Sequence, residues 1–109
     1  MGSEMCIRDR IICEGIATGC TLAQIDPTAI VLAAMTAGNL LPVAQAIRAA
    51  HQQDQIIIAG DNDRFIDGNP GRTKAIETAR AIGGEYSIPE FPPGVSGSDF
   101  NDLACAGFM

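Results

Sequence analysis

Two aspartates separated by one residue are the part of this sequence best suited to chemistry. Asp61-Asn62-Asp63 directly follows the apolar run Ile56–Gly60. Two carboxylates pointing into one crevice repel each other, and a divalent cation relieves that repulsion. Their hard oxygen atoms suit Mg²⁺ or Mn²⁺. Turns in acidic proteins also carry Asp and Asn for turn formation alone, so the pair by itself leaves both interpretations open.

Further acids favour the metal interpretation. Glu14 ends the apolar run Ile11–Cys13, and the segment 99–102 reads DFND. Loops at the carboxyl ends of parallel strands meet at one edge of a sheet. We therefore expect Glu14 to converge with Asp61 and Asp63, an arrangement that turn chemistry does not explain.

Alternating strand and helix patterns would position these acids. Apolar runs predict strands over 11–13, 29–35, 56–60 and 85–88. The near-continuous run Ala29–Met35 is typical of a central strand buried on both faces. Residues with helical periodicity predict helices over 17–25, 40–50 and 70–82. The sequence thus predicts an α/β fold with about four strands, mostly parallel, and helices on both faces.

Three residues beside the expected crevice have predicted structural roles. We expect Gly15 and Gly38 to let the backbone turn sharply there, because glycine tolerates conformations closed to other residues. Asn39 precedes the helical pattern over 40–50 and is expected to cap it. Asn69-Pro70 in the same way predicts the start of the helix over 70–82.

Composition limits the function. The 109 residues suffice for one domain, and the net charge of -6 argues against a surface that holds nucleic acid unaided. Four cysteines include no CxxC pair, and His51 is the single histidine, so we expect buried reduced thiols and no zinc in this chain. No run resembles a membrane span or a secretory signal, so we expect no membrane partner and a cytoplasmic location.

Residues 1–10, MGSEMCIRDR, show neither strand nor helix periodicity and join abruptly onto Ile11. We expect them to be a non-native leader, which leaves 11–109 as the domain.

Several motifs together resemble the Toprim domains of phage and plasmid DNA primases, from about Ile11 to Leu103. The motifs are Cys13-Glu14-Gly15, Ala37-Gly38-Asn39-Leu40, Ala59-Gly60-Asp61-Asn62-Asp63, Asn69-Pro70-Gly71 and Asp99-Phe100-Asn101-Asp102-Leu103. The resemblance implies a Rossmannoid fold whose signature is a glutamate after the first strand and a DxD after the third.

The family resemblance also implies a function. It implies Mg²⁺ or Mn²⁺ bound through Asp61 and Asp63, with Glu14 near the metal or in proton transfer and all three catalytic. Asp99 would be a further, weaker metal ligand, and a plain helix-capping role for Asp99 or Asn101 is an equally good alternative. The implied reaction is RNA primer synthesis from ribonucleoside triphosphates on single-stranded DNA. Such primases usually carry zinc-binding and helicase domains, so the resemblance makes 11–109 a fragment of a longer enzyme.

Three cations lie near the expected crevice in the sequence: Arg64, Arg72 and Lys74. We expect them to be candidates for binding nucleotide or template, because guanidinium and ammonium groups bind phosphate. A solvated surface charge is the alternative for each of them.

Two other functions remain open. A Toprim-type nuclease would need the same acids and metal, and a non-catalytic interaction module could keep the fold alone. A topoisomerase is disfavoured unless its tyrosine nucleophile lies outside these 109 residues, because the single tyrosine here, Tyr86, lies in a predicted strand.

Overall fold

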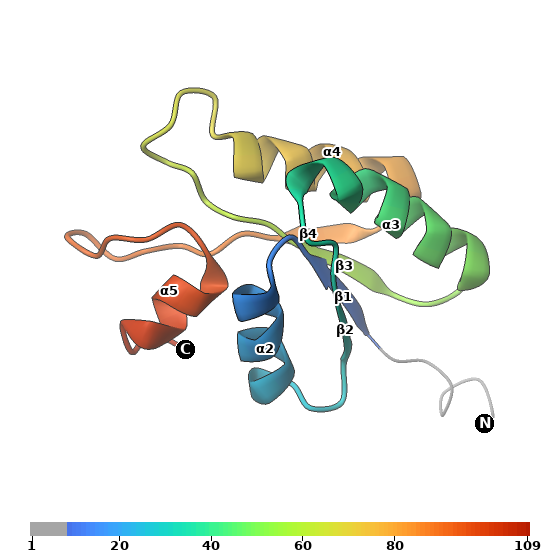
Figure 1. Cartoon of the computed structure of the whole chain (residues 1–109), viewed down its shortest axis with the longest axis horizontal. Coiled ribbons are helices and arrows are strands. Elements are labelled where there is room, and N and C mark those ends of the chain that lie inside the picture. Colours follow the sequence, from blue (N-terminus) through green and yellow to red (C-terminus); the bar gives the residue numbers. More distant parts are fainter. Residues whose placement is uncertain (1–8) are drawn as a thin grey trace.

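The computed structural model describes residues 9–109, which form a four-stranded parallel sheet with helices on both faces (Figure 1). The strands are β1 (Arg10–Cys13), β2 (Ile30–Ala33), β3 (Ile56–Ala59) and β4 (Glu85–Ser87). The helices are α2 (Ile16–Ile25), α3 (Ala37–Ala50), α4 (Pro70–Ile82) and α5 (Phe100–Cys105). The predicted α/β class, the parallel sheet and the two helical layers are confirmed.

The strand order is β2-β1-β3-β4, so β1 and β3 are the inner strands. Ile12 of β1 is aligned with Leu32 of β2 on one side and with Ile58 of β3 on the other. The prediction that the second strand is central was wrong, because β2 is an edge strand and is only half-buried along its length. Its continuous apolar character arises because its two faces contact two different helical layers, with Leu32 packed on one core cluster and Val31 on the other.

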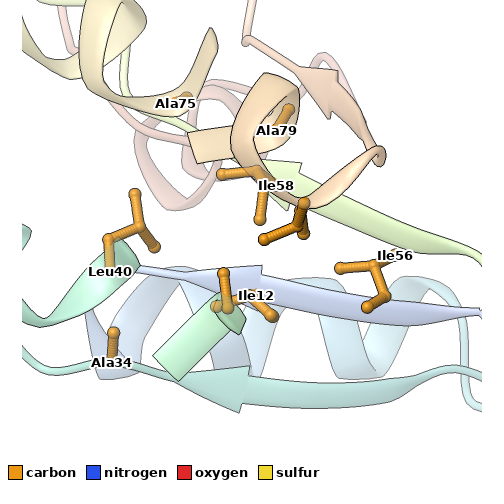
Figure 2. Close-up of a cluster of buried hydrophobic side chains, with 9 residues drawn as sticks. Ile12, Ala34, Leu40, Ile56, Ile58, Ala75 and Ala79 are labelled. Carbon is orange, nitrogen blue, oxygen red and sulfur yellow. The ribbon is translucent and has the colours of Figure 1, made fainter. Parts of the chain in front are cut away.

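The larger part of the core lies between the sheet and helices α3 and α4, which run side by side over one face (Figure 1). Ile12, Ile56 and Ile58 are fully buried there, and Figure 2 shows Ile58 next to the small side chains Ala75 and Ala79 of α4. Burying each isoleucine contributes about 1.5–3 kcal/mol. The alanines let the helix approach the sheet closely, which brings the N-terminus of α4 near the carboxyl end of β3.

Helices α2 and α5 cover the opposite face (Figure 1). Ile11 and Cys13 of β1 pack there with Leu22 of α2 and Phe100 of α5. The hydroxyl of Thr21 also donates a hydrogen bond to Asn101 Oδ1 at 2.9 Å, which joins the two helices. The six residues of α5 are too few to show a clear helical period, so this helix was anticipated only through the alternative that Asp99 or Asn101 is a helix cap, and Asp99 is that cap.

The helix starts differ in how well they were predicted. Helix α3 begins at Ala37, and its cap is Thr36, whose hydroxyl accepts the backbone N–H of Asn39 at 3.2 Å. The predicted capping role of Asn39 is thereby corrected; its side-chain amide instead donates to the carbonyl of Ala34 at 3.2 Å. Asn69 does cap α4 as expected, accepting the N–H of Arg72 at 3.3 Å.

Arg48 connects the C-terminal ends of α3 and α4 through hydrogen bonds from its side chain. Its guanidinium donates to the carbonyls of Asp54 at 2.7 Å, Ile82 at 2.8 Å and His51 at 3.2 Å. The last carbonyls of a helix have no partner within the helix, and a cation there also suits the helix dipole. This side chain therefore stabilises the end of the domain opposite to the acidic loops.

The expected leader lies, apart from Asp9 and Arg10, outside the described residues. Arg10 opens β1, and its guanidinium contacts Asp54 at 2.8 Å, so the ordered strand starts one residue before the expected boundary. Among the described cysteines Cys13 is buried while Cys20 and Cys105 are exposed, so burial was predicted correctly for Cys13 alone. Within residues 9–109, no helix has the length and apolar character needed to cross a membrane.

Candidate metal centre

The two inner strands bring the three predicted acids into one cavity. Cys13 of β1 is aligned with Ala59 of β3, so Glu14 and the Asp61 loop leave the sheet at the same edge. Glu14, Asp61 and Asp63 line a cavity of about 340 Å³, and Lys74 of α4 closes another side of it. The convergence expected from parallel strands is therefore present in the structure.

Asp61 has the most perturbed environment in this cavity. Burial, as the largest cause, and the negative charges of Glu14, Asp99 and Asp63 together raise its pKa from 3.8 to about 7. Both effects disfavour the ionised carboxylate. A cation in the cavity would oppose both, so the surroundings of Asp61 are those of a site that favours positive charge.

Asp63 is held in place by the first turn of α4. Its Oδ2 atom accepts the backbone N–H of Gly71 at 2.8 Å, and its own backbone N–H donates to Asn69 Oδ1 at 2.7 Å. A carboxylate at a helix N-terminus is stabilised by the free N–H groups and the helix dipole. Among residues 9–109 no hydrogen bond uses Asp63 Oδ1, which leaves that oxygen for a ligand.

Asn62, between the two aspartates, serves the loop rather than the cavity. Its backbone N–H donates to the carbonyl of Ser98 at 2.6 Å, and its side-chain amide donates to the carbonyl of Pro89 at 2.9 Å. Its Oδ1 accepts from Asn69 Nδ2 at 2.8 Å. The residue thus ties the loop after β3 to the segment after β4, which fixes the direction of its acidic neighbours.

Two glycines that position the site were not singled out from the sequence. A Cβ on Gly71 would lie 2.7 Å from Asp63 Oδ2 and 2.8 Å from Asp61 Cβ, so only glycine lets α4 approach the aspartates. A Cβ on Gly60 would lie 2.4 Å from Ala75 Cβ. The available signal was the place of both glycines inside the motifs, directly before the DxD and directly after Asn69-Pro70.

The roles predicted for Gly15 and Gly38 are corrected. Gly15 has extended backbone, with φ −106°, and no other side chain lies within 4 Å of a Cβ placed there. Gly38 lies inside α3, where the nearest atom to an added Cβ is Thr36 Oγ1 at 3.9 Å. Neither position uses glycine's freedom to turn.

Asp99 lies beside the centre without lining the cavity. Its carboxylate accepts the backbone N–H of Asp102 at 2.7 Å and caps α5, and Asp102 completes a capping box. The backbone N–H of Ser98 donates a hydrogen bond that is the main cause of the lowered pKa of Asp102, and the backbone N–H of Asp99 lowers this pKa further. The charge of Asp99 still reaches Asp61, so capping and a weaker ligand role are compatible, and the ligand role stays a prediction.

The three predicted cations separate in space. Lys74 lines the acidic cavity. Arg72 is exposed and lies outside that lining. The guanidinium of Arg64 lies over the rings of both Phe65 and Phe91 and donates to the carbonyl of Val95. Of the three, Lys74 alone is placed to meet a phosphate inside the cavity.

The acids offer an incomplete coordination shell. In the described part of the chain, no three His, Cys, Asp or Glu side chains lie in an arrangement that would by itself hold a metal ion. Mg²⁺ commonly binds through one or two carboxylates and completes its shell with waters and substrate phosphates. The cavity matches that kind of site better than a closed protein cage.

Comparisons with known proteins agree with this geometry. A family model described as Toprim domain matches residues 9–107. Two Escherichia coli proteins, both named DNA primase TraC, are 46% identical over 88 residues and 42% identical over 87 residues. These matches cover 77% and 76% of this chain but 8% and 6% of the relatives, so the chain spans less than a tenth of their length. No solved structure matches the chain.

Proposed function

Because this chain belongs to the Toprim family, we propose that it is the catalytic domain of a phage- or plasmid-type DNA primase. In this proposal it joins ribonucleotides into a primer on single-stranded DNA. The observation that carries the proposal is the single cavity lined by Glu14, Asp61, Asp63 and Lys74 at the carboxyl edge of β1 and β3. The relatives named DNA primase support the same reaction.

Asp61 and Asp63 are the residues we propose to hold Mg²⁺ or Mn²⁺. The fit rests on the donor chemistry and the charge of the cavity: carboxylate oxygens suit these ions, and neighbouring acids help to raise the pKa of Asp61 to about 7. When bound, the ion stabilises the negative charge that develops on phosphate oxygens during phosphoryl transfer.

The other cavity residues have complementary roles in this proposal. Lys74 places an ammonium group where the triphosphate would lie and offsets part of its charge. Arg72 is two residues earlier on α4, and residues two apart do not share a helix face. We therefore assign the triphosphate contact to Lys74, and leave Arg72 and Arg64 for contacts outside the cavity.

Glu14 is either a further ligand or the group that takes the proton from the attacking hydroxyl. Its place in the cavity with both aspartates permits each role. As the new oxygen–phosphorus bond forms, pyrophosphate leaves. A Glu14→Gln variant that still binds Mn²⁺ like the parent would assign the proton role; one with weakened binding would assign the ligand role.

The acidic composition implies that the template needs additional contacts. With 13 acidic against 7 basic residues, the composition of this chain disfavours unaided binding of a phosphate backbone. We propose that zinc-binding and helicase domains of the full-length protein supply it.

The test is whether a ribonucleoside triphosphate binds only together with the metal. Equilibrium dialysis with labelled ATP should show binding in Mn²⁺ and none in chelator. Binding should disappear in an Asp61→Asn/Asp63→Asn variant and persist in Asp67→Asn, which changes an exposed acid of the same loop. Metal-independent binding, or equal binding by all variants, would overturn the proposed site.

Product analysis separates the alternatives. With labelled template, Mn²⁺ and ribonucleotides, a primase produces RNA and leaves the template intact, whereas a Toprim-type nuclease shortens the template. An interaction module would do neither and would be indifferent to chelator.

A further inference from the structure

Phe65 is an exposed aromatic residue two positions after the second aspartate of the site. It is 83% exposed, compared with 47% for Tyr86 and 52% for Phe108. Its neighbour Ile66 is 58% exposed. Two adjacent large apolar side chains held in water beside a candidate catalytic cavity call for a binding partner.

The loop that carries Phe65 is firmly held. A turn joins the N–H of Ile66 to the carbonyl of Asp63 at 2.9 Å, and the N–H of Asn69 donates to the carbonyl of Ile66 at 3.0 Å. The hydroxyl of Thr73 donates to the carbonyl of Gly68 at 2.8 Å. Phe65 is therefore exposed from a loop whose backbone is held by hydrogen bonds.

Arg64 contacts the ring of Phe65. Its guanidinium carbon lies 4.8 Å from the centre of the Phe65 ring and 4.5 Å from the centre of the Phe91 ring. The hydrogen bond from Arg64 to the carbonyl of Val95 fixes this arrangement. The guanidinium thus contacts both rings, and Phe65 is the more exposed of the two.

The surroundings of Arg64 and Phe65 connect these residues to the metal centre. Arg64 and Phe65 form the shared wall of two hollows of about 280 Å³ and 390 Å³. Asp63 lines both the smaller hollow and the acidic cavity. A ligand on Phe65 would therefore lie next to whatever occupies the acidic cavity.

We propose that Phe65 is a stacking platform for a base of single-stranded nucleic acid bound across the metal centre. This rests on the proposed function and adds a template subsite to it. An uncharged base can stack beside acids that would repel its phosphates, which reconciles nucleic-acid binding with a net charge of -6. Aromatic rings and arginine stack on any base, so the contact is independent of sequence.

The openness of the platform favours a strand over a free nucleotide. A ring exposed to 83% does not enclose a ligand, so a single base gains little there unless neighbouring nucleotides are bound as well. Ile66, directly beside it, offers a second apolar surface for the next base.

Fluorescence of a base analogue tests the proposal in the complete chain. The probe is a single-stranded oligodeoxythymidylate of about ten nucleotides with one 2-aminopurine, whose fluorescence falls when it stacks, titrated in Mn²⁺. The parent should quench the probe. Phe65→Leu, which keeps an apolar side chain but removes the ring, should bind about 5- to 150-fold more weakly, and Phe65→Trp should restore quenching. Phe108→Leu removes an exposed ring outside both hollows and should match the parent.

Two outcomes would overturn the proposal: no quenching by the parent, or equal quenching by the parent and Phe65→Leu. Stronger competition by free ATP than by unlabelled oligonucleotide would assign the platform to the incoming nucleotide instead and would equally overturn it. Mn²⁺-dependent ATP binding is measured on the same samples. If that binding persists while the base contact fails, the metal centre stands and the stacking subsite alone is wrong.

Discussion

Replacing Gly71 with alanine should both loosen the fold and weaken the metal centre. Gly71 is the second residue of α4, and a Cβ there would meet Asp63 Oδ2 at 2.7 Å and Asp61 Cβ at 2.8 Å. An ordinary contact begins near 3.4 Å, so the helix or the loop must move by about 0.7 Å. That movement would stretch the 2.8 Å hydrogen bond from Gly71 to Asp63.

The magnitude follows from opposing effects. Overpacking of this kind costs about 1–3 kcal/mol. A weakened hydrogen bond to a charged carboxylate adds to that cost, while alanine's higher helix propensity returns about 0.5–1 kcal/mol. We expect a net loss of about 1–3 kcal/mol, which lowers Tm by at least about 4 °C in a domain of this size.

Gly38→Ala is the matched control, because Gly38 is likewise the second residue of its helix and has no atom nearer than 3.9 Å to an added Cβ. Urea unfolding followed by circular dichroism should show Gly38→Ala as stable as the parent, or more stable by up to about 1 kcal/mol. Mn²⁺ affinity should fall in Gly71→Ala alone. A Gly71→Ala protein with the stability and Mn²⁺ affinity of the parent would refute the argument that close approach of α4 holds Asp63.

Four further predictions concern protonation and helix ends. Because the pKa of Asp61 is raised from 3.8 to about 7, the metal-free protein should lose stability as pH rises from about 4 to 7, and Asp61→Asn should remove this dependence in urea titrations. Protons also compete with the metal at that carboxylate, so Mn²⁺ affinity measured by calorimetry should rise with pH and level off above about 7. Arg48→Met should cost about 2–3 kcal/mol of unfolding free energy, since the carbonyls of Ile82 and His51 at two helix ends lose a charged donor; a loss below about 0.5 kcal/mol would contradict this. Asp99→Ala should cost about 1 kcal/mol through the lost cap of α5, and Mn²⁺ affinity near the parent's would exclude Asp99 as a ligand.

The local sequence patterns predicted most of the helices and strands, but they did not predict which of these lie next to each other in the fold. The strand and helix periods predicted β1, α2, β3 and α4 with small errors in their ends. The position of β2 at the edge depends on which side of β1 each crossover returns, and that information is not contained in a run of apolar residues. The apolar run over 29–35 reads the same in an edge strand covered by two helical layers.

The site shows the same division. Glu14, Asp61 and Asp63 could be grouped from the sequence because parallel strands must end at one edge. The direction of Arg64 could not be predicted, because it depends on Phe91, which is 27 positions away in sequence and comes into contact only in the fold. Gly71 was missed for a similar reason. Only glycine fits at this position because Asp63, eight residues earlier in the sequence, lies against it in the fold.

Calorimetric titration of the chain with Mn²⁺ tests the central claim most directly. We predict saturable binding by the parent and by Asp67→Asn, and its loss in Asp61→Asn/Asp63→Asn, with circular dichroism confirming that all three are folded. Equal Mn²⁺ binding by the parent and the folded double variant, or no binding by the parent, would contradict the assignment of this cavity as a metal centre.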